Sequence, residues 1–124
     1  MIQIINTEKA PAAVGPYVQA KVVGEMIYTS GQLPINPATG KMPEDISAQT
    51  QQSLANVEAI LLAAGSDKSK IVKATVFVKD LNDFAQVNAA YAEFFGENCP
   101  ARSCVEVARL PLDAKVEIEV IAVK

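Results

Sequence analysis

The sequence predicts an α+β domain in which two helices pack on one face of a mixed or mostly antiparallel sheet. Three observations lead to this prediction. The periodic segments follow the order strands, helix, strand, helix, strands. Each helical segment carries a single apolar stripe, which must be buried against another layer. The 124 residues suffice for one compact domain and not for two, so we expect a single domain spanning residues 1–124.

The N-terminal third predicts short strands joined by loops. Residues 3–6 are an apolar run that suits an edge strand, and residues 18–31 indicate two strands around a hairpin turn at Gly24-Glu25. The segments rich in Pro and Gly, which we interpret as irregular loops, are 10–18 and 33–43.

Residues 45–65 and 80–96 predict two amphipathic helices, since their apolar residues recur at i, i+3, i+7 and i+10. The stripes are Leu54, Val57, Leu61 and Ala64 in the first helix and Phe84, Val87, Tyr91 and Phe94 in the second. The N-cap candidates are Asp45 or Ser47 for the first and Asp80 or Asn82 for the second, and the helices end at Gly65 and Gly96.

Alternation predicts strands within residues 71–79, 102–108 and 114–124. The apolar faces expected to pack on the helices are Val72, Ala74, Val76 and Val78 in the first of these strands and Val116, Ile118, Val120 and Ala122 in the last. The opposite faces also hold apolar residues, among them Phe77, Ile121 and Val123. Two helices leave that second face uncovered, so we expect a partner subunit to cover it.

Composition also favours a homo-oligomer. Half of the residues are hydrophobic and the mean hydropathy is positive, whereas a chain of this length buries only about two-thirds of its unfolded surface by itself. Subunit contact would cover the surplus apolar surface.

Charge and residue types exclude several function classes. A net charge of −3 without basic clusters argues against a large nucleic-acid footprint. No apolar stretch approaches the roughly 18 residues of a membrane helix, and the N-terminus lacks a signal-peptide pattern, so we expect a cytoplasmic protein. With no histidine and two cysteines, the chain lacks the ligands of a four-ligand zinc site and the base of Ser-His or Cys-His nucleophilic pairs.

The stretch PARSCVEV, residues 100–107, places a cation beside a thiol at the start of a strand. Alternation puts Arg102 and Cys104 on one face. An arginine there is ordinarily a solvated surface residue, but its planar guanidinium also matches the two oxygens of a carboxylate. Free cysteine usually behaves as a small buried hydrophobe, and no histidine is present to take the Cys104 proton.

Four other positions are candidates on weaker grounds. Glu117 is either an exposed strand carboxylate or a general acid/base whose pKa is raised by partial burial and by Glu119 two positions along. Tyr17 and Ser30 lie in loop-like stretches, where binding groups often occur. Asn88 flanks the apolar stripe of the second helix and would ordinarily be a surface residue.

Taken together, these stretches resemble the RidA (YjgF) family of reactive intermediate deaminases. The resemblance covers nearly the whole chain. The most specific part is Pro-Ala-Arg-Ser at 100–103, a hydrophobic strand, a spacer, and Val-Glu-Ile at 116–118. The other stretches that carry it are APAAVGPYVQA, YTSGQLPINPATG, SLANVEAILLAAG and VKATVFVKDLNDFAQVNAAY.

The resemblance implies a chorismate mutase-like α+β subunit in a homotrimer, with pockets between subunits and no cofactor. It implies hydrolysis of 2-aminoacrylate and 2-aminocrotonate, or the corresponding 2-iminopropanoate and 2-iminobutanoate, which serine and threonine dehydratases dependent on pyridoxal phosphate release. The products are the 2-oxo acid and ammonia. By position, Arg102 would bind the substrate carboxylate and Glu117 would position or activate water. Cys104 would lend its backbone N–H, and the remaining pocket residues would be Tyr17, Ser30, Gly31 and Asn88.

Two alternatives from other classes remain at this point. A regulatory trimer that binds small carboxylates without catalysis would use Arg102 and would not need Glu117. A translation-inhibiting or endoribonuclease-like activity would need RNA contacts, and the acidic balance of the chain argues against it.

Overall fold

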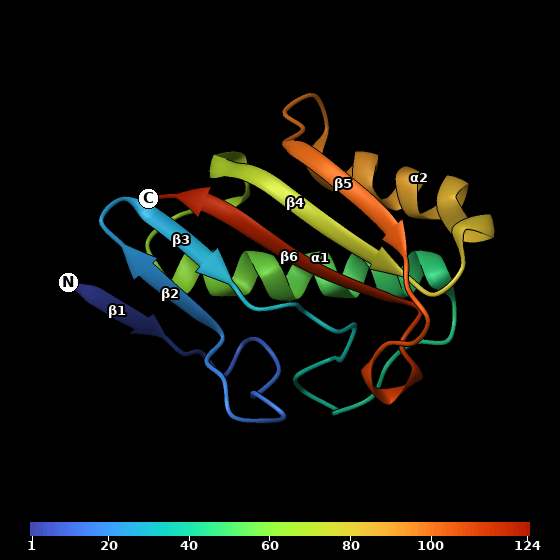
Figure 1. The fold of residues 1–124 in the computed structure, drawn as a ribbon, viewed down its shortest axis with the longest axis horizontal. Coiled ribbons are helices and arrows are strands. Elements are labelled where there is room, and N and C mark those ends of the chain that lie inside the picture. The colour runs from blue at the N-terminus through green and yellow to red at the C-terminus, as the bar shows by residue number, and fades with distance from the viewer.

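The computed structural model describes residues 1–124 and contains one six-stranded sheet of order β1-β2-β3-β6-β4-β5 (Figure 1). The strands are β1 (Ile2–Ile5), β2 (Ala20–Val23), β3 (Met26–Thr29), β4 (Ile71–Val78), β5 (Ala101–Glu106) and β6 (Val116–Val123). All neighbouring strands are antiparallel except β4 and β5, which are parallel. The predicted α+β class and mixed sheet are therefore confirmed.

Two helices, α1 (Ile46–Ala63) and α2 (Phe84–Phe95), lie on the same side of this sheet (Figure 1). Helix α1 packs against β6 and α2, and the main core lies between the helices and the sheet. Of the two N-cap candidates, Asp45 caps α1, since its side chain accepts from the Ala48 N–H at 3.0 Å. Asp80 caps a 3-10 turn, Leu81–Asp83, that leads into α2.

The core face of β4 differs from the prediction at its first residue. Val72 is 49% exposed, whereas Ile71 is buried beside Ala74. The pairing of β4 with β6 shifts register between Ile71 and Lys73, as at a β-bulge. One extra residue reverses the alternation at that point, so the prediction for Val72 was wrong. The apolar face of β6 is confirmed, because Val116, Ile118, Val120 and Ala122 are all buried.

The buried stripe of α2 is also displaced from the predicted one. Val87 and Tyr91 are buried as expected, but Phe84 is 40% exposed and Phe95 is buried. Phe84 begins the helix near the free edge of the sheet at β5, where the core no longer covers it. The prediction of Phe84 as a core residue was wrong, and this aromatic ring is left available for another contact.

The second face of the sheet is covered only in part. Phe77 packs against a small cluster formed by Leu33, Leu110 and Ala114, from the loops that follow β3 and β5. Elsewhere on this face Tyr28 and Val105 are more than 40% exposed. The chain itself therefore covers Phe77, while the apolar surface around Tyr28 and Val105 stays open.

Buried amides fix the loops beside the sheet. The Gln19 side chain accepts from the Thr7 N–H at 2.7 Å and donates to the Pro11 carbonyl at 2.8 Å. The Asn56 amide donates to the carbonyls of Leu33 and Ile35 at 3.0 and 2.9 Å. These bonds fix the shape of the loop before β2 and tie the loop after β3 to helix α1. No helix of the protein has the length and apolar character needed to cross a membrane.

Candidate active site

Glu117 lies on β6, on the face of the sheet opposite the helices, and lines an open cleft of about 530 Å³. The predicted site residues Tyr17, Ser30 and Gly31 line the same cleft, with Glu119 at its margin. They reach it from the loop before β2 and from the chain just after β3. Four predicted site residues from three parts of the sequence thus surround one cavity.

Gly31 stands directly against the Glu117 side chain. A Cβ atom at position 31 would lie 2.8 Å from Cδ and Oε2 of Glu117. The residues that follow Gly31 and Glu117 in the chain fix the distance between these two. Gln32 and Ile118 exchange backbone hydrogen bonds of 2.7 and 3.2 Å. The absence of a side chain at Gly31 therefore gives the carboxylate its position.

Gly31→Ala is expected to lower kcat/KM by about ten- to a hundredfold, because the new methyl group displaces the Glu117 carboxylate from its working position. The melting temperature should change little, since the crowded atoms are the end of a flexible side chain. Steady-state kinetics and a thermal melt test this. Gly15→Ala is the matched control, because its Cβ would meet only the Tyr17 ring at 3.6 Å. Wild-type kinetics for Gly31→Ala would show that this close approach has no catalytic role.

The electrostatic setting of Glu117 raises the pKa of its carboxyl above the ordinary value. Burial is the larger cause, and the like charge of Glu119 is the second. Both disfavour the ionised form, so the carboxylate is a stronger base than an exposed glutamate. This is the setting predicted for a general acid/base at this position.

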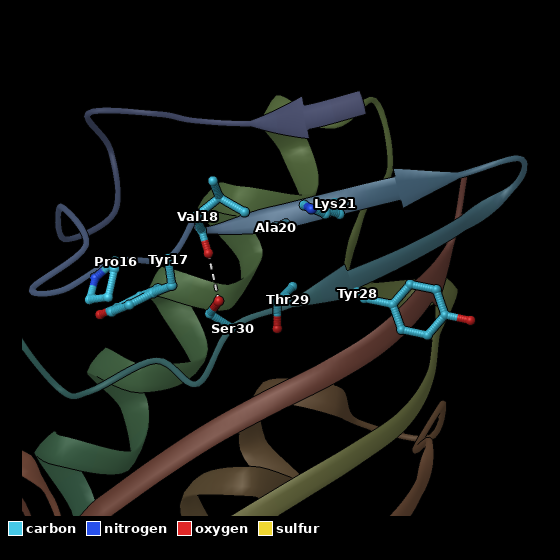
Figure 2. Close-up of a pocket in the computed structure, with 8 residues that line it drawn as sticks. All are labelled: Pro16, Tyr17, Val18, Ala20, Lys21, Tyr28, Thr29 and Ser30. Carbon is cyan, nitrogen blue, oxygen red and sulfur yellow. Dashed lines mark hydrogen bonds between the residues drawn. The ribbon is translucent and has the colours of Figure 1, made fainter. Parts of the chain in front are cut away.

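Ser30 and Tyr17 are held by local hydrogen bonds. The Ser30 hydroxyl donates to the Val18 carbonyl at 2.6 Å, the dashed line in Figure 2. The Tyr17 hydroxyl accepts from the Val14 N–H at 3.1 Å. Both residues also line a second hollow of about 490 Å³ along β2 and β3. Figure 2 shows them toward the end of this hollow that is opposite Tyr28. Tyr17 and Ser30 therefore stand between the two hollows.

Arg102 lies elsewhere, on the helix side of β5. Its Nη1 donates to the Asn88 side-chain oxygen at 2.8 Å. The guanidinium carbon lies 4.8 Å from the centre of the Tyr91 ring and 5.5 Å from that of Phe84. The predicted site residues Arg102 and Asn88 are thus in direct contact.

The Arg102 guanidinium has no carboxylate partner. The only side-chain ion pair of the chain joins Arg109 and Asp113, both largely exposed. A guanidinium has five N–H donors, and only the bond to Asn88 joins that of Arg102 to the protein. A partly buried cation with free donors in a planar fork is suited to a bound carboxylate.

Cys104 lies on the same face as Arg102, as predicted, and packs against the main core. Burial raises the pKa of its thiol, and Arg102 only partly opposes this, so the thiol form is favoured. The backbone N–H of Cys104, rather than its thiol, is available as a hydrogen-bond donor. The Val107 N–H donates to the Val78 carbonyl, and the alternation of a parallel ladder then leaves the Cys104 N–H on the free edge of the sheet.

The two groups of residues do not meet within one chain. Arg102 is in register with Ala74, which is buried on the helix side of the sheet. Glu117 is in register with Phe77, three residues farther along β4 and on the other face. One cluster thus contains the unpaired cation and consists of Arg102, Asn88 and Cys104. The other contains the carboxyl with the raised pKa and consists of Tyr17, Ser30, Gly31 and Glu117.

A model of the family described as endoribonuclease L-PSP, the RidA family, matches residues 7–124. The chain belongs to this family. A curated RidA-family relative from Escherichia coli, named 2-iminobutanoate/2-iminopropanoate deaminase, is 63% identical over 127 residues, covering 100% of this chain and 99% of the relative. A RutC family protein from Haemophilus influenzae is 65% identical over 128 residues, covering 100% and 98%.

Solved RidA-family structures confirm the fold that the resemblance implied. The structure of the Escherichia coli YjgF gene product superposes with a TM-score of 0.96 at 62% identity, covering 98% of each chain. The structure of Escherichia coli TdcF with bound serine gives a TM-score of 0.95 at 54% identity, again with 98% of each chain covered.

The aromatic surroundings of Arg102 in this RidA-family chain were not among the residues predicted from the sequence. Phe84, Asn88 and Tyr91 are spaced i, i+4 and i+7 and therefore share one face of α2. Two aromatic residues and an amide on one face of a helix are a sequence pattern that suits contact with a cation. This pattern could have predicted that the three residues lie beside an arginine. The aromatic residues had instead been interpreted only as core.

Proposed function

We propose that the protein hydrolyses small 2-imino acids to 2-oxo acids and ammonia. One observation carries the proposal: the partly buried Arg102 has free donors and no carboxylate partner, in a family that includes a 63% identical 2-iminobutanoate/2-iminopropanoate deaminase. The raised pKa of Glu117 supports it, because the reaction needs a proton acceptor for water.

The chemistry requires only binding, orientation and proton transfer. The enamine released by a dehydratase tautomerises to an imine, whose carbon is electrophilic. Arg102 holds the substrate carboxylate while Glu117 accepts a proton from water as the water oxygen bonds to that carbon. Glu117 passes this proton to the nitrogen, which gives the neutral carbinolamine. The hydroxyl proton then moves to the same nitrogen as the C–N bond breaks, so ammonia leaves as the C=O bond forms. Fixing the carboxylate makes the attack nearly unimolecular.

We place the complete site between subunits of a homotrimer. Arg102 and Glu117 occupy opposite faces of the sheet in one chain, so one small substrate must meet Arg102 from one subunit and Glu117 from another. The exposed apolar surface at Tyr28 and Val105 supports such an assembly, because a partner would cover it.

We place the substrate's source among serine and threonine dehydratases dependent on pyridoxal phosphate, in the cytoplasm. Elimination of water from serine or threonine yields the three- and four-carbon enamines that match a small carboxylate site. The neighbouring TdcF structure with bound serine supports this substrate class, because serine offers the same carboxylate to an arginine.

A coupled assay tests the proposed function. Threonine dehydratase acts on threonine, and 2-oxobutanoate appearance is followed with and without the protein. The protein should increase the rate beyond the spontaneous hydrolysis of the intermediate. An unchanged rate over a wide range of protein concentration would refute the deaminase proposal.

Glu119→Gln is expected to shift the acid limb of the pH–kcat/KM profile to lower pH. Glu117 acts as a carboxylate, so activity falls as pH drops through its raised pKa. Removing the like charge of Glu119 lowers that pKa, and activity then persists to lower pH. Glu58→Gln, on helix α1 away from the cleft, is the control. An acid limb that moves up or stays fixed would argue against Glu117 as the titrating base.

The bound serine of the TdcF structure also favours a second candidate, a trimer that binds small carboxylates and regulates a partner without catalysis. That function needs Arg102 and not Glu117. Binding of 2-oxobutanoate by wild type, together with no acceleration in the coupled assay, would support this candidate instead.

A further inference from the structure

We infer that Tyr91 is a positioning residue for the carboxylate-binding arginine, with Phe84 as its second wall. The inference rests on the proposed function, because it assigns a role in holding Arg102 for the substrate. The two rings and Arg102 are called here the aromatic clamp.

The geometry of the clamp is that of cation–π contact. The guanidinium carbon of Arg102 lies 4.8 Å from the Tyr91 ring centre and 5.5 Å from the Phe84 ring centre, both within the roughly 6 Å range of this interaction. Asn88, one helical turn from each ring, accepts from Nη1 at 2.8 Å. The helix therefore presents a ring, an amide and a ring in one stripe beneath the cation.

An unpaired arginine on an edge strand needs such support. A long side chain with no ion-pair partner samples many rotamers, and ordering it when the substrate binds costs affinity. Contacts with two rings and an amide hold the guanidinium in place before the substrate arrives. A preorganised fork then binds the carboxylate with less entropic loss.

The Tyr91 hydroxyl shows that its ring is the functional part. Tyr91 is only 5% exposed, and its hydroxyl has no hydrogen-bond partner in the protein. A buried hydroxyl without a hydrogen-bond partner destabilises the fold. The hydroxyl therefore does not explain why Tyr91 occupies this position. Burial raises the pKa of Tyr91 to about 12 despite the nearby Arg102, so the ring faces the cation as a neutral group. The adjacent Phe95 ring, with its centre 4.6 Å away, packs against the Tyr91 ring and restricts its movement.

The test compares Tyr91→Leu with Tyr91→Phe, using titration calorimetry with 2-oxobutanoate and steady-state kinetics. Tyr91→Leu removes the ring, and the Kd for 2-oxobutanoate and the KM should both rise about tenfold, with kcat nearly unchanged. Tyr91→Phe keeps the ring, so Kd and KM should stay within about twofold of wild type and the melting temperature should not fall. A merely structural role for Tyr91 would lower the melting temperature of Tyr91→Leu without this selective rise in Kd and KM.

Several outcomes would overturn the inference. One is an unchanged Kd and KM in Tyr91→Leu, and another is an equal loss in Tyr91→Phe, which would assign the effect to the hydroxyl. If Tyr91→Leu does not fold, Phe84→Leu replaces it, because Phe84 is 40% exposed and its loss leaves the core intact. The Kd of Phe84→Leu for 2-oxobutanoate should rise about threefold, and an unchanged Kd would refute the clamp.

Failure of the proposed deaminase function would give a different result. The wild type would bind 2-oxobutanoate, and Tyr91→Leu would weaken this binding, but the wild type would not accelerate hydrolysis. A wild type that neither binds 2-oxobutanoate nor accelerates hydrolysis would overturn both.

Discussion

Arg102→Ala is expected to lower kcat/KM for imine hydrolysis on the order of a hundred- to a thousandfold, because it leaves the substrate carboxylate without its charge partner. Arg102→Lys should retain only a small part of the activity. A lysine keeps the charge but loses both the planar fork and the stacking on the Tyr91 ring. The coupled dehydratase assay measures both variants, with KM obtained by varying the imine supply.

Arg109→Ala is the matched control for this prediction. Arg109 is the only other arginine of the chain, and its exposed ion pair with Asp113 faces solvent. Activity within about twofold of wild type is expected, since exposed pairs contribute little. Cys104→Ala should retain most of the activity, because its expected contribution is the backbone N–H. A dead Cys104→Ala together with a fully active Arg102→Ala would reverse the roles assigned to cation and thiol.

Glu117→Gln is expected to reduce kcat on the order of a hundred- to ten-thousandfold, the range of general base catalysis, while the Kd for 2-oxobutanoate changes little. The amide is nearly isosteric with the carboxylate but cannot accept a proton from water. Steady-state kinetics and titration calorimetry separate the two effects. Full activity in Glu117→Gln would remove the proton acceptor from the mechanism.

The same substitution should stabilise the fold. A carboxyl with a raised pKa contributes stability only when protonated, and this contribution is lost as pH rises through its pKa toward neutrality. At neutral pH the ionised Glu117 is therefore a net destabilising group, and glutamine removes both its burial cost and its repulsion from Glu119. A thermal melt at pH 7 should show a higher melting temperature for Glu117→Gln, and at pH 4 the difference should shrink. A lower melting temperature at pH 7 would show that Glu117 has a structural role.

Alternation and helical periodicity predicted most of the fold. The β6 face of Val116, Ile118, Val120 and Ala122 is buried as expected, since an unbroken strand keeps a period of two. The same rule failed at Val72, because a one-residue bulge is set by pairing with β6 and leaves no mark in local sequence. Sequence periodicity thus describes an element and not its irregularities.

The sequence predicted only in part which of the candidate residues lie together. Arg102 and Cys104 share a face as alternation required, and Gly31 and Glu117 lie in one cleft. Their division into two halves depends on which sheet face each strand presents, and this follows from the sheet order, a tertiary property. The role of Tyr91 was missed for a related reason. An aromatic residue in a helical stripe is predicted as core, and only the fold shows which cation lies over its ring.

Mixing two inactive variants tests most directly that imine hydrolysis occurs at a site shared between subunits. Arg102→Ala and Glu117→Gln chains, co-expressed with different affinity tags and purified as mixed oligomers, are measured in the coupled assay. In a trimer that contains both variants, about one site in three pairs an intact Arg102 with an intact Glu117 from the neighbouring subunit. Activity should therefore recover to roughly a third of the wild-type rate per site. Activity that stays at the level of the two separate variants would contradict a site composed of residues from two subunits.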